Sequence, residues 1–308
     1  MVMITIVFLC LYYLKSTLDY KVNDIDWDSV YDVISLNYQL LVVVIILVPI
    51  NWGIEALKWK WILKDTQNLS WGRSVKSVLS GVAMSIITPN GVGEYGGRMF
   101  GINRSKRSQA LFYNGFLSIS QLLTTIVFGL FGLLLISKSF SLPFSNTMQL
   151  IIIVVLISYG FWLYFTSKFS FGFIKLILQK YNLNIVYEIS RNLRLQVLLL
   201  SILRYIVFCS QYYLLIICFK YDADIIETFS SIAFVYLCTV ILPTGWFSGF
   251  IVRGSVSYFV FQSVLNSGEF GLVASSLLWL INLLLPALAG LYYIKSFKLF
   301  PIINSEII

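Results

Sequence analysis

Charged side chains interrupt an apolar part of this chain at residues 88–101, which read TPNGVGEYGGRMFG. Glu94 and Arg98 stand four positions apart with the acid first, the order that favours an ion pair on one helix face. Pro89 ends the helix before them, and glycine permits a turn with positive φ. The glycines of the stretch are Gly91, Gly93, Gly96, Gly97 and Gly101. This combination predicts a polar site rather than a connecting loop.

The composition indicates that the site lies in a membrane. Hydrophobic residues make up 58% of the 308 residues and charged residues only 12%, about half of the roughly 25% usual in soluble domains. The formal net charge is +8, but the basic residues cluster beside apolar segments, which argues against nucleic-acid binding. The chain has no histidine, and its four cysteines show no paired spacing, so we expect no metal, cofactor or disulfide framework.

Apolar segments of spanning length predict an all-α integral membrane protein. We expect a short first helix at residues 1–14 and an amphipathic interfacial segment at residues 169–181. The five further spans are expected at residues 38–56, 111–136, 148–165, 197–219 and 271–293. The basic connections after residues 56 and 165 and the acidic one at 15–32 place both termini in the cytoplasm of an inner-membrane, multi-pass protein. We expect one membrane domain, residues 1–308. It has six transmembrane helices if the two shorter apolar segments are not full spans, and eight if they are.

A second broken stretch, LPTGWFSGFIVRG at residues 242–254, repeats the order of the first: proline, a polar residue, glycines and a late arginine, Arg253. Backbone that is broken at membrane depth persists only where it is buried in protein or lines a cavity. We therefore interpret both stretches as re-entrant hairpins that enter from opposite sides. This order suggests inverted repeat halves, residues 38–136 and 197–293, with a site near the midplane between them.

Charged groups at membrane depth are costly and mark functional sites by default. The candidates are Glu55, Glu94, Arg98, Arg204 and Arg253, with Gln211 on the same helix as Arg204. Three arginines against two glutamates leave a positive surplus, which suits an anionic group such as a lipid phosphate. Structural roles stay open: an ion pair that closes the first hairpin (Glu94 and Arg98), snorkelling (Arg204), a pair with Lys58 (Glu55), a cap (Arg253), and packing for the glycines.

Three segments resemble the lysylphosphatidylglycerol synthase transmembrane-domain family: ITPNGVGEYGGR with the basic cluster after it, LPTGWFSGFIVRG, and NWGIEALKWKWIL at residues 51–63. The resemblance covers nearly the whole chain, although no acid adjoins Arg253 in the second motif. It implies a membrane region that moves lipids between leaflets, and, with no soluble aminoacyl-transfer domain before Ile308, no synthase activity. It also implies a lipid-headgroup cavity lined by Glu94, Arg98, Gly91, Gly93 and Gly97, with Arg253 as a counterpart.

Three functions remain open at this point. The first is a carrier that binds and translocates an anionic or modified polar lipid. The second is a non-catalytic membrane partner of a separately encoded envelope enzyme. The third is a lipid-linked glycosyl or headgroup transferase with Glu94 as acid or base, for which Glu55 is the only second carboxylate at similar depth. No Walker, zinc or Ser–His motif is present, and we rank the carrier first and the transferase last.

Overall fold

The computed structural model describes residues 9–10, 12–13, 15–16, 37–88, 91–140, 145–166, 188–219, 224–242 and 246–296. Within these residues the regular structure is entirely helical. The α-helices are α3 (Tyr38–Ile62), α4 (Trp71–Ile87), α5 (Gly93–Arg98), α6 (Arg107–Leu135), α7 (Asn146–Thr166), α9 (Arg191–Cys218), α10 (Ile225–Ile241), α11 (Trp246–Leu265) and α12 (Gly268–Ser296). This confirms the all-α class. Of the first expected helix the structure describes residues 9–10, 12–13 and 15–16, which are helical. The expected segment 169–181 lies outside the described residues.

Five of the described helices are long and apolar enough to cross a membrane: α3, α6, α7, α9 and α12. They coincide with the five long spans that the sequence predicts. Helices α4 and α10 have 17 residues each. At about 1.5 Å per residue they reach roughly 25 Å, which is less than the roughly 30 Å of a bilayer's hydrocarbon core. Their length therefore suits re-entrant elements better than full spans.

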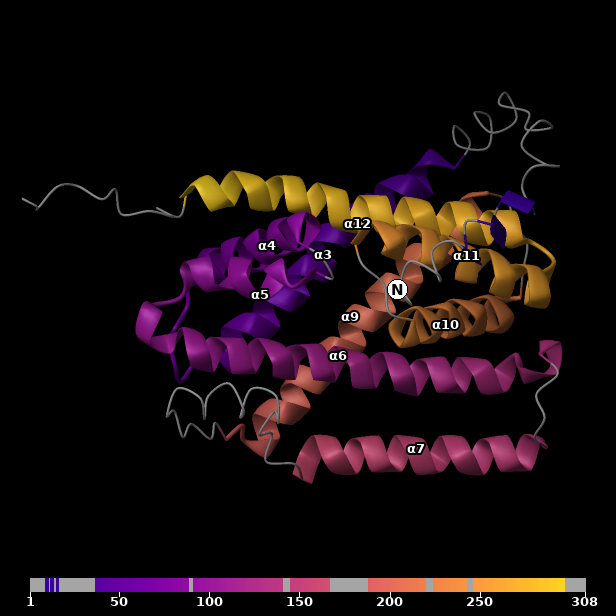
Figure 1. The fold of residues 1–308 in the computed structure, drawn as a ribbon, viewed down its shortest axis with the longest axis horizontal. Helices are drawn as coiled ribbons and strands as arrows, with labels where there is room; N and C mark the ends of the chain where they lie inside the picture. Colours follow the sequence, from indigo (N-terminus) through magenta and orange to yellow (C-terminus); the bar gives the residue numbers. More distant parts are fainter. Residues whose placement is uncertain are drawn as a thin grey trace, which may run out of the picture.

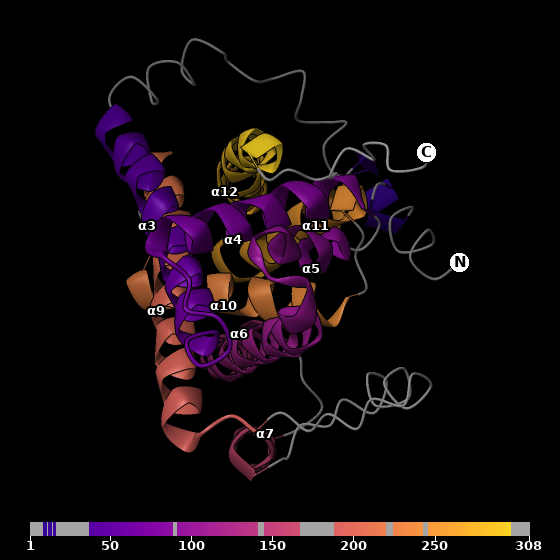
Figure 2. The ribbon, with the colours of Figure 1, turned by 90° about the vertical axis from the view of Figure 1, so that its left-hand side faces the viewer.

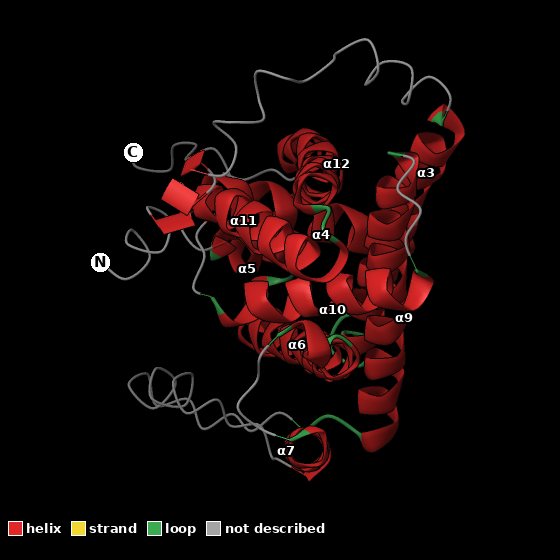
Figure 3. Cartoon of the chain, turned by 90° about the vertical axis from the view of Figure 1, so that its right-hand side faces the viewer, coloured by secondary structure: helices red, strands yellow, loops and turns green. Residues whose placement is uncertain are grey.

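The two hairpins occupy opposite halves of the bundle. Helices α6 and α12 run along its long axis; α4 and α5 lie between them at one end, and α10 and α11 at the other (Figure 1). Viewed along that axis, α3 and α9 lie side by side at one edge of the bundle (Figure 2). Helix α7 lies at the outer edge of the bundle, where it packs against α6 (Figure 3) and where its Tyr164 is hydrogen-bonded to Arg194 of α9. This arrangement agrees with hairpins that enter from opposite sides.

The turn of the first hairpin is built by a threonine and a glycine. The hydroxyl of Thr88 donates to the Met84 carbonyl at 2.9 Å and accepts from the Gly93 amide at 2.6 Å. Gly91 has φ +68°, a left-handed conformation that other residues adopt at a cost. Thr88 therefore links the end of α4 to the start of α5 across the break.

Glycines let α5 lie directly on α4. A Cβ on Gly93 would stand 2.5 Å from the Thr88 hydroxyl oxygen, and a Cβ on Gly97 would stand 2.7 Å from the Gly81 Cα. Neither distance is sterically possible for a real side chain. The structure therefore assigns these two glycines to close helix packing, the structural role that the sequence left open.

A row of hydrogen bonds joins α3 to α9 in antiparallel register, and we call it the α3–α9 seam. Its bonds are Asn37 Nδ2 to Cys218 O (3.0 Å), Gln211 Nε2 to Val44 O (2.9 Å) and Arg204 Nε to Asn51 Oδ1 (2.8 Å). On each helix the bonded residues recur every seven positions, the period that keeps one face of a helix against a partner. The seam fixes which residues of α9 face Glu55.

Candidate functional site

One buried carboxylate, that of Glu55 in α3, is surrounded by three cations. Its Oε2 lies 2.7 Å from Lys58 Nζ and 3.0 Å from Arg204 Nη1, and its Oε1 lies 2.9 Å from Arg98 Nη2. Only 4% of the Glu55 side chain is exposed. A charge this deep persists only when it is paired and hydrogen-bonded. We call Glu55, Lys58, Glu94, Arg98 and Arg204 the charged cluster.

Arg98 joins the first hairpin to α3. Its Nη2 contacts Glu94 Oε1 at 2.6 Å as well as Glu55. Its guanidinium lies over the ring of Trp59, 5.5 Å from the ring centre. Only 2% of Arg98 is exposed, yet its Nε and Nη1 have no hydrogen-bond partner. Arg98 therefore keeps unused donors in a place where an unpaired donor is expensive.

Arg204 enters the cluster from α9. Its Nε donates to Asn51 Oδ1, and its guanidinium lies 5.0 Å from the ring centre of Trp52 and 5.4 Å from that of Phe208. A cation over an aromatic face is attracted by the ring quadrupole. Asn51 and the two rings therefore hold the Arg204 guanidinium in a fixed plane beside Glu55.

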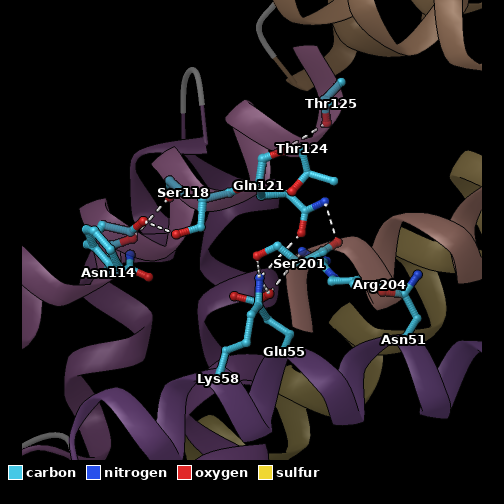
Figure 4. Close-up of polar contacts among 12 residues, drawn as sticks. Asn51, Glu55, Lys58, Asn114, Ser118, Gln121, Thr124, Thr125, Ser201 and Arg204 are labelled. Atoms are coloured by element: carbon cyan, nitrogen blue, oxygen red, sulfur yellow. Dashed lines mark hydrogen bonds and ion pairs between the residues drawn. The ribbon is translucent and has the colours of Figure 1, made fainter. Parts of the chain in front are cut away.

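Lys58 is fully buried and lies where three helices meet. Besides Glu55, its Nζ lies 3.3 Å from the Ser201 hydroxyl and 3.4 Å from Gln121 Oε1. Gln121 Nε2 in turn donates to the Ser201 carbonyl at 3.4 Å. Figure 4 shows these side chains converging from α3, α6 and α9. Protein oxygen atoms therefore take the place of water around the Lys58 ammonium group.

The charged cluster forms one wall of a cavity of about 290 Å³, which we call the polar cavity. Its other lining residues are Trp52, Leu117, Ser118, Gln121, Leu122, Thr125 and Val240. Ser118, Gln121 and Thr125 recur every three or four positions, so they share one face of α6 (Figure 4). Glu94 and Arg98 come from the first hairpin and Val240 from the end of α10, so both hairpins reach this cavity.

The charges of the cluster favour an anionic ligand. Three cations against two carboxylates leave one positive charge beside the polar cavity. The unused Nε and Nη1 of Arg98 supply donors that need no displaced protein partner. Guanidinium groups bind phosphate and carboxylate through paired donors. In the described part of the chain no group of three or more His, Cys, Asp or Glu side chains is placed to hold a metal ion.

The structure brings four predicted site residues together, namely Glu55, Glu94, Arg98 and Arg204. It places Gln211 in the α3–α9 seam instead. Gly93 and Gly97 serve helix packing, and Gly91 the turn; none of the three lines the polar cavity. Arg253 does not line it either, and lies close enough to Tyr212 and Tyr236 to interact with them electrostatically.

Sequence reasoning treated Lys58 only as a structural partner of Glu55 and missed Gln121 and Ser201 altogether. The pairing of Lys58 with Glu55 is confirmed, but the lysine also lines the polar cavity. A usable signal was present: Glu55 and Lys58 are three positions apart on α3, as are Ser201 and Arg204 on α9. Polar residues at that spacing share a helix face.

The comparisons with known proteins agree with this architecture. The model of the family described as lysylphosphatidylglycerol synthase TM region matches residues 1–290, which include both hairpins and the whole charged cluster. No curated protein sequence matched the chain. The family match and the membrane-length helices connect the chain to lipid or envelope function in a membrane. The chain belongs to the lysylphosphatidylglycerol synthase transmembrane-region family.

Proposed function

We propose that this chain binds the anionic or modified polar headgroup of a membrane lipid in the polar cavity and carries the lipid between leaflets. One observation carries the proposal: Arg98 is buried beside the polar cavity with Nε and Nη1 unpartnered. A buried donor without a partner costs about 1–3 kcal/mol, and more when charged. A phosphate oxygen that accepts from these groups removes that cost.

Membrane lipids are the anions that this cavity can meet. It lies among helices of membrane length, and its lining includes Glu94 and Arg98 from the first hairpin and Val240 from the second. A phosphate headgroup enters between the hairpins while its acyl chains stay in hydrocarbon. This division is favourable because only the charged group has to leave water.

Glu55 occupies the position of a built-in counter-ion. With no lipid bound, its carboxylate neutralises part of the charge of Lys58, Arg98 and Arg204. A phosphate that enters competes with Glu55 for the same three cations and neutralises the one positive charge that the two carboxylates leave. Such balanced binding favours release as well as capture, which a carrier needs. The chain shows no nucleotide-binding motif, so we propose downhill or ion-coupled movement.

The proposed location of the protein is the inner (cell) membrane, with both termini in the cytoplasm. This orientation is supported by basic residues at the connected ends of α3, α4 and α6, at positions 60, 64, 73, 76, 104, 106 and 107. Basic connections remain on the cytoplasmic side.

Native mass spectrometry of gently extracted protein tests the proposal. We expect the wild type to retain an anionic lipid and Arg98→Ala to lose it. Arg73→Ala is the matched control, because Arg73 is an exposed cation in the first turn of α4 and should leave retention unchanged. Retention by Arg98→Ala equal to that of the wild type would refute the site. If no form retains lipid selectively, the envelope-enzyme partner becomes the better hypothesis, and co-purification tests it.

A further inference from the structure

Lys58 is the cation of the charged cluster that is able to lose its proton. The guanidinium groups of Arg98 and Arg204 stay protonated in proteins, whereas a lysine changes its protonation readily when it is buried. Lys58 is fully buried on α3, and it lines the polar cavity. Its protonation is therefore the variable charge of this site.

The surroundings of Lys58 accommodate both the ammonium and the neutral amine. An ammonium has three donors, and Nζ lies 2.7 Å from Glu55 Oε2, 3.3 Å from the Ser201 hydroxyl and 3.4 Å from Gln121 Oε1 (Figure 4). The neutral amine has two donors and one lone pair. Because a hydroxyl both accepts and donates, the Ser201 hydroxyl can turn and donate to that lone pair. A proton can thus leave Nζ without leaving the lone pair unpaired.

Three helices supply the charges that surround Lys58. Its own helix α3 supplies Glu55, α5 supplies Glu94 and Arg98, and α9 supplies Arg204. Helix α6 presents only neutral side chains to the polar cavity. In the described part of the chain, α4, α10 and α12 add no charged or titratable side chain to it. The charge beside the cavity is therefore set by these four groups and Lys58.

Binding of a lipid phosphate and protonation of Lys58 offset each other in charge. With Lys58 protonated, three cations and two carboxylates leave one positive charge, which a phosphodiester with one negative charge cancels. With Lys58 neutral and no lipid bound, two cations face two carboxylates. Neutralising Glu55 instead would leave three cations against one carboxylate. The site is therefore neutral when it holds both a lipid and a proton, and again when it holds neither.

These two neutral forms are the ones that rearrange at the lowest cost. A carrier has to change its access from one side to the other both with and without its lipid. An uncompensated charge at membrane depth is costly, and that cost falls on any rearrangement of the empty, protonated form or of the loaded, deprotonated form. Charge balance therefore ties the proton to the phosphate.

We infer that lipid movement is coupled to a proton carried on Lys58 Nζ, so that one proton and one anionic lipid cross together. The inference rests on the proposed function, for which it names the coupling ion. The proton binds the Nζ lone pair when the phosphate enters, and it returns to solvent through the polar cavity when the phosphate leaves. No covalent bond of the lipid changes. Net movement is electroneutral, so it follows a pH gradient and not a membrane potential.

Lipid movement in vesicles with imposed gradients tests the coupling. The protein is reconstituted in phosphatidylcholine vesicles with a trace of acyl-labelled phosphatidylglycerol, and a membrane-impermeant reductant of the label reports the fraction in the outer leaflet. With the interior about one pH unit more acidic and the potential clamped at zero, we expect the outer-to-inner ratio of labelled lipid to rise about tenfold. A potassium diffusion potential without a pH gradient should leave the ratio unchanged. A ratio that ignores the pH gradient, or that follows the potential, would overturn the inference.

Substitutions of Lys58 identify the proton site. Lys58→Arg keeps three cations but fixes the charge, so its lipid ratio should follow the potential and ignore the pH gradient. Arg73→Gln is the matched control, because Arg73 is an exposed cation in the first turn of α4, and it should behave as the wild type does. A Lys58→Arg protein that still responds to the pH gradient would exclude Lys58 as the proton carrier. Should Lys58→Arg not fold, Lys58→Met replaces it: it should also lose the pH response, and a retained tenfold shift would contradict the inference.

The outcomes separate the inference from the proposed function. If the wild type moves labelled phosphatidylglycerol between leaflets but the pH gradient does not shift the ratio, the coupling fails and the carrier stands. If the wild type neither moves the lipid nor retains it in native mass spectrometry, the proposed function fails and the coupling fails with it. Lipid retention by Lys58→Arg equal to that of the wild type, together with loss of the pH response, is the combination that we expect.

Discussion

The replacement Glu55→Gln should destabilise the protein far more than Glu94→Gln, the removal of the other carboxylate of the charged cluster. The Glu55 carboxylate contacts three cations at 2.7, 2.9 and 3.0 Å, and the exposed fractions of the Lys58, Arg98 and Arg204 side chains are only 1%, 3% and 13%. Glutamine fills the same volume but leaves the cations without this counter-charge. Breaking a buried ion pair by removing one partner costs about 3–5 kcal/mol. We expect a loss in this range in the free energy of unfolding.

Glu94→Gln is the matched control. Its carboxylate contacts one cation, Arg98, and its side chain is 36% exposed, so solvent screens the pair and its loss should cost about 1 kcal/mol or less. The assay is equilibrium unfolding in mixed micelles titrated with a denaturing detergent, followed by circular dichroism. If the two variants lose the same free energy, Glu55 does not neutralise the three cations and the reasoning is refuted.

The same assay tests anion binding. With Glu55 neutral, the charge beside the polar cavity rises from one to two positive charges. Phosphatidylglycerol should therefore stabilise Glu55→Gln more than it stabilises the wild type, because a ligand that binds only the folded state adds to its stability. Equal stabilisation of both proteins by the lipid would count against a phosphate site at this position.

Three further predictions concern the hairpins. Gly290→Ala should cost about 1–3 kcal/mol in unfolding free energy, since its Cβ would overlap the neighbouring helix; Gly96→Ala, with nothing within 4 Å of the new Cβ, should cost nothing measurable, and equal effects would contradict the packing. Gly91→Ala, at φ +68°, should cost about 1–2 kcal/mol, which a thermal unfolding series in detergent would detect. In a chain without its native cysteines, Asn68→Cys and Glu227→Cys should react with an impermeant maleimide from opposite sides of a sealed vesicle; reaction from the same side would rule out inverted hairpins.

Much of the architecture could be predicted because it depends on local patterns. Span lengths follow from runs of apolar residues, and the breaks follow from Pro89 and the glycines after it. Glu94 and Arg98 could be paired from sequence because their contact is made within one short helix. The five long helices have limits at most seven residues from the predicted ones.

The charged cluster could be predicted only in part, because its contacts join residues far apart in the chain. Glu55 appeared to belong to the basic membrane interface, whereas in the structure it binds Arg98 and Arg204 from two other helices. Gln121 carries no charge and gives no signal by itself; its role depends on the place where α6 crosses α3. The sequence shows which residues are costly to bury. Which of them come into contact depends on how the helices pack against one another.

The α3–α9 seam restricts how this protein can move. Its three hydrogen bonds recur every seven residues on both helices, so a slide by one residue would break all of them at once. A small rotation about the Asn51–Arg204 contact, at one end of the seam, strains only the other two bonds. Sliding of α3 along α9 therefore costs more free energy than rocking of one helix against the other. Any exchange between inward-open and outward-open forms should therefore turn the two halves about this contact, with the largest displacements at the helix ends that lie farthest from it.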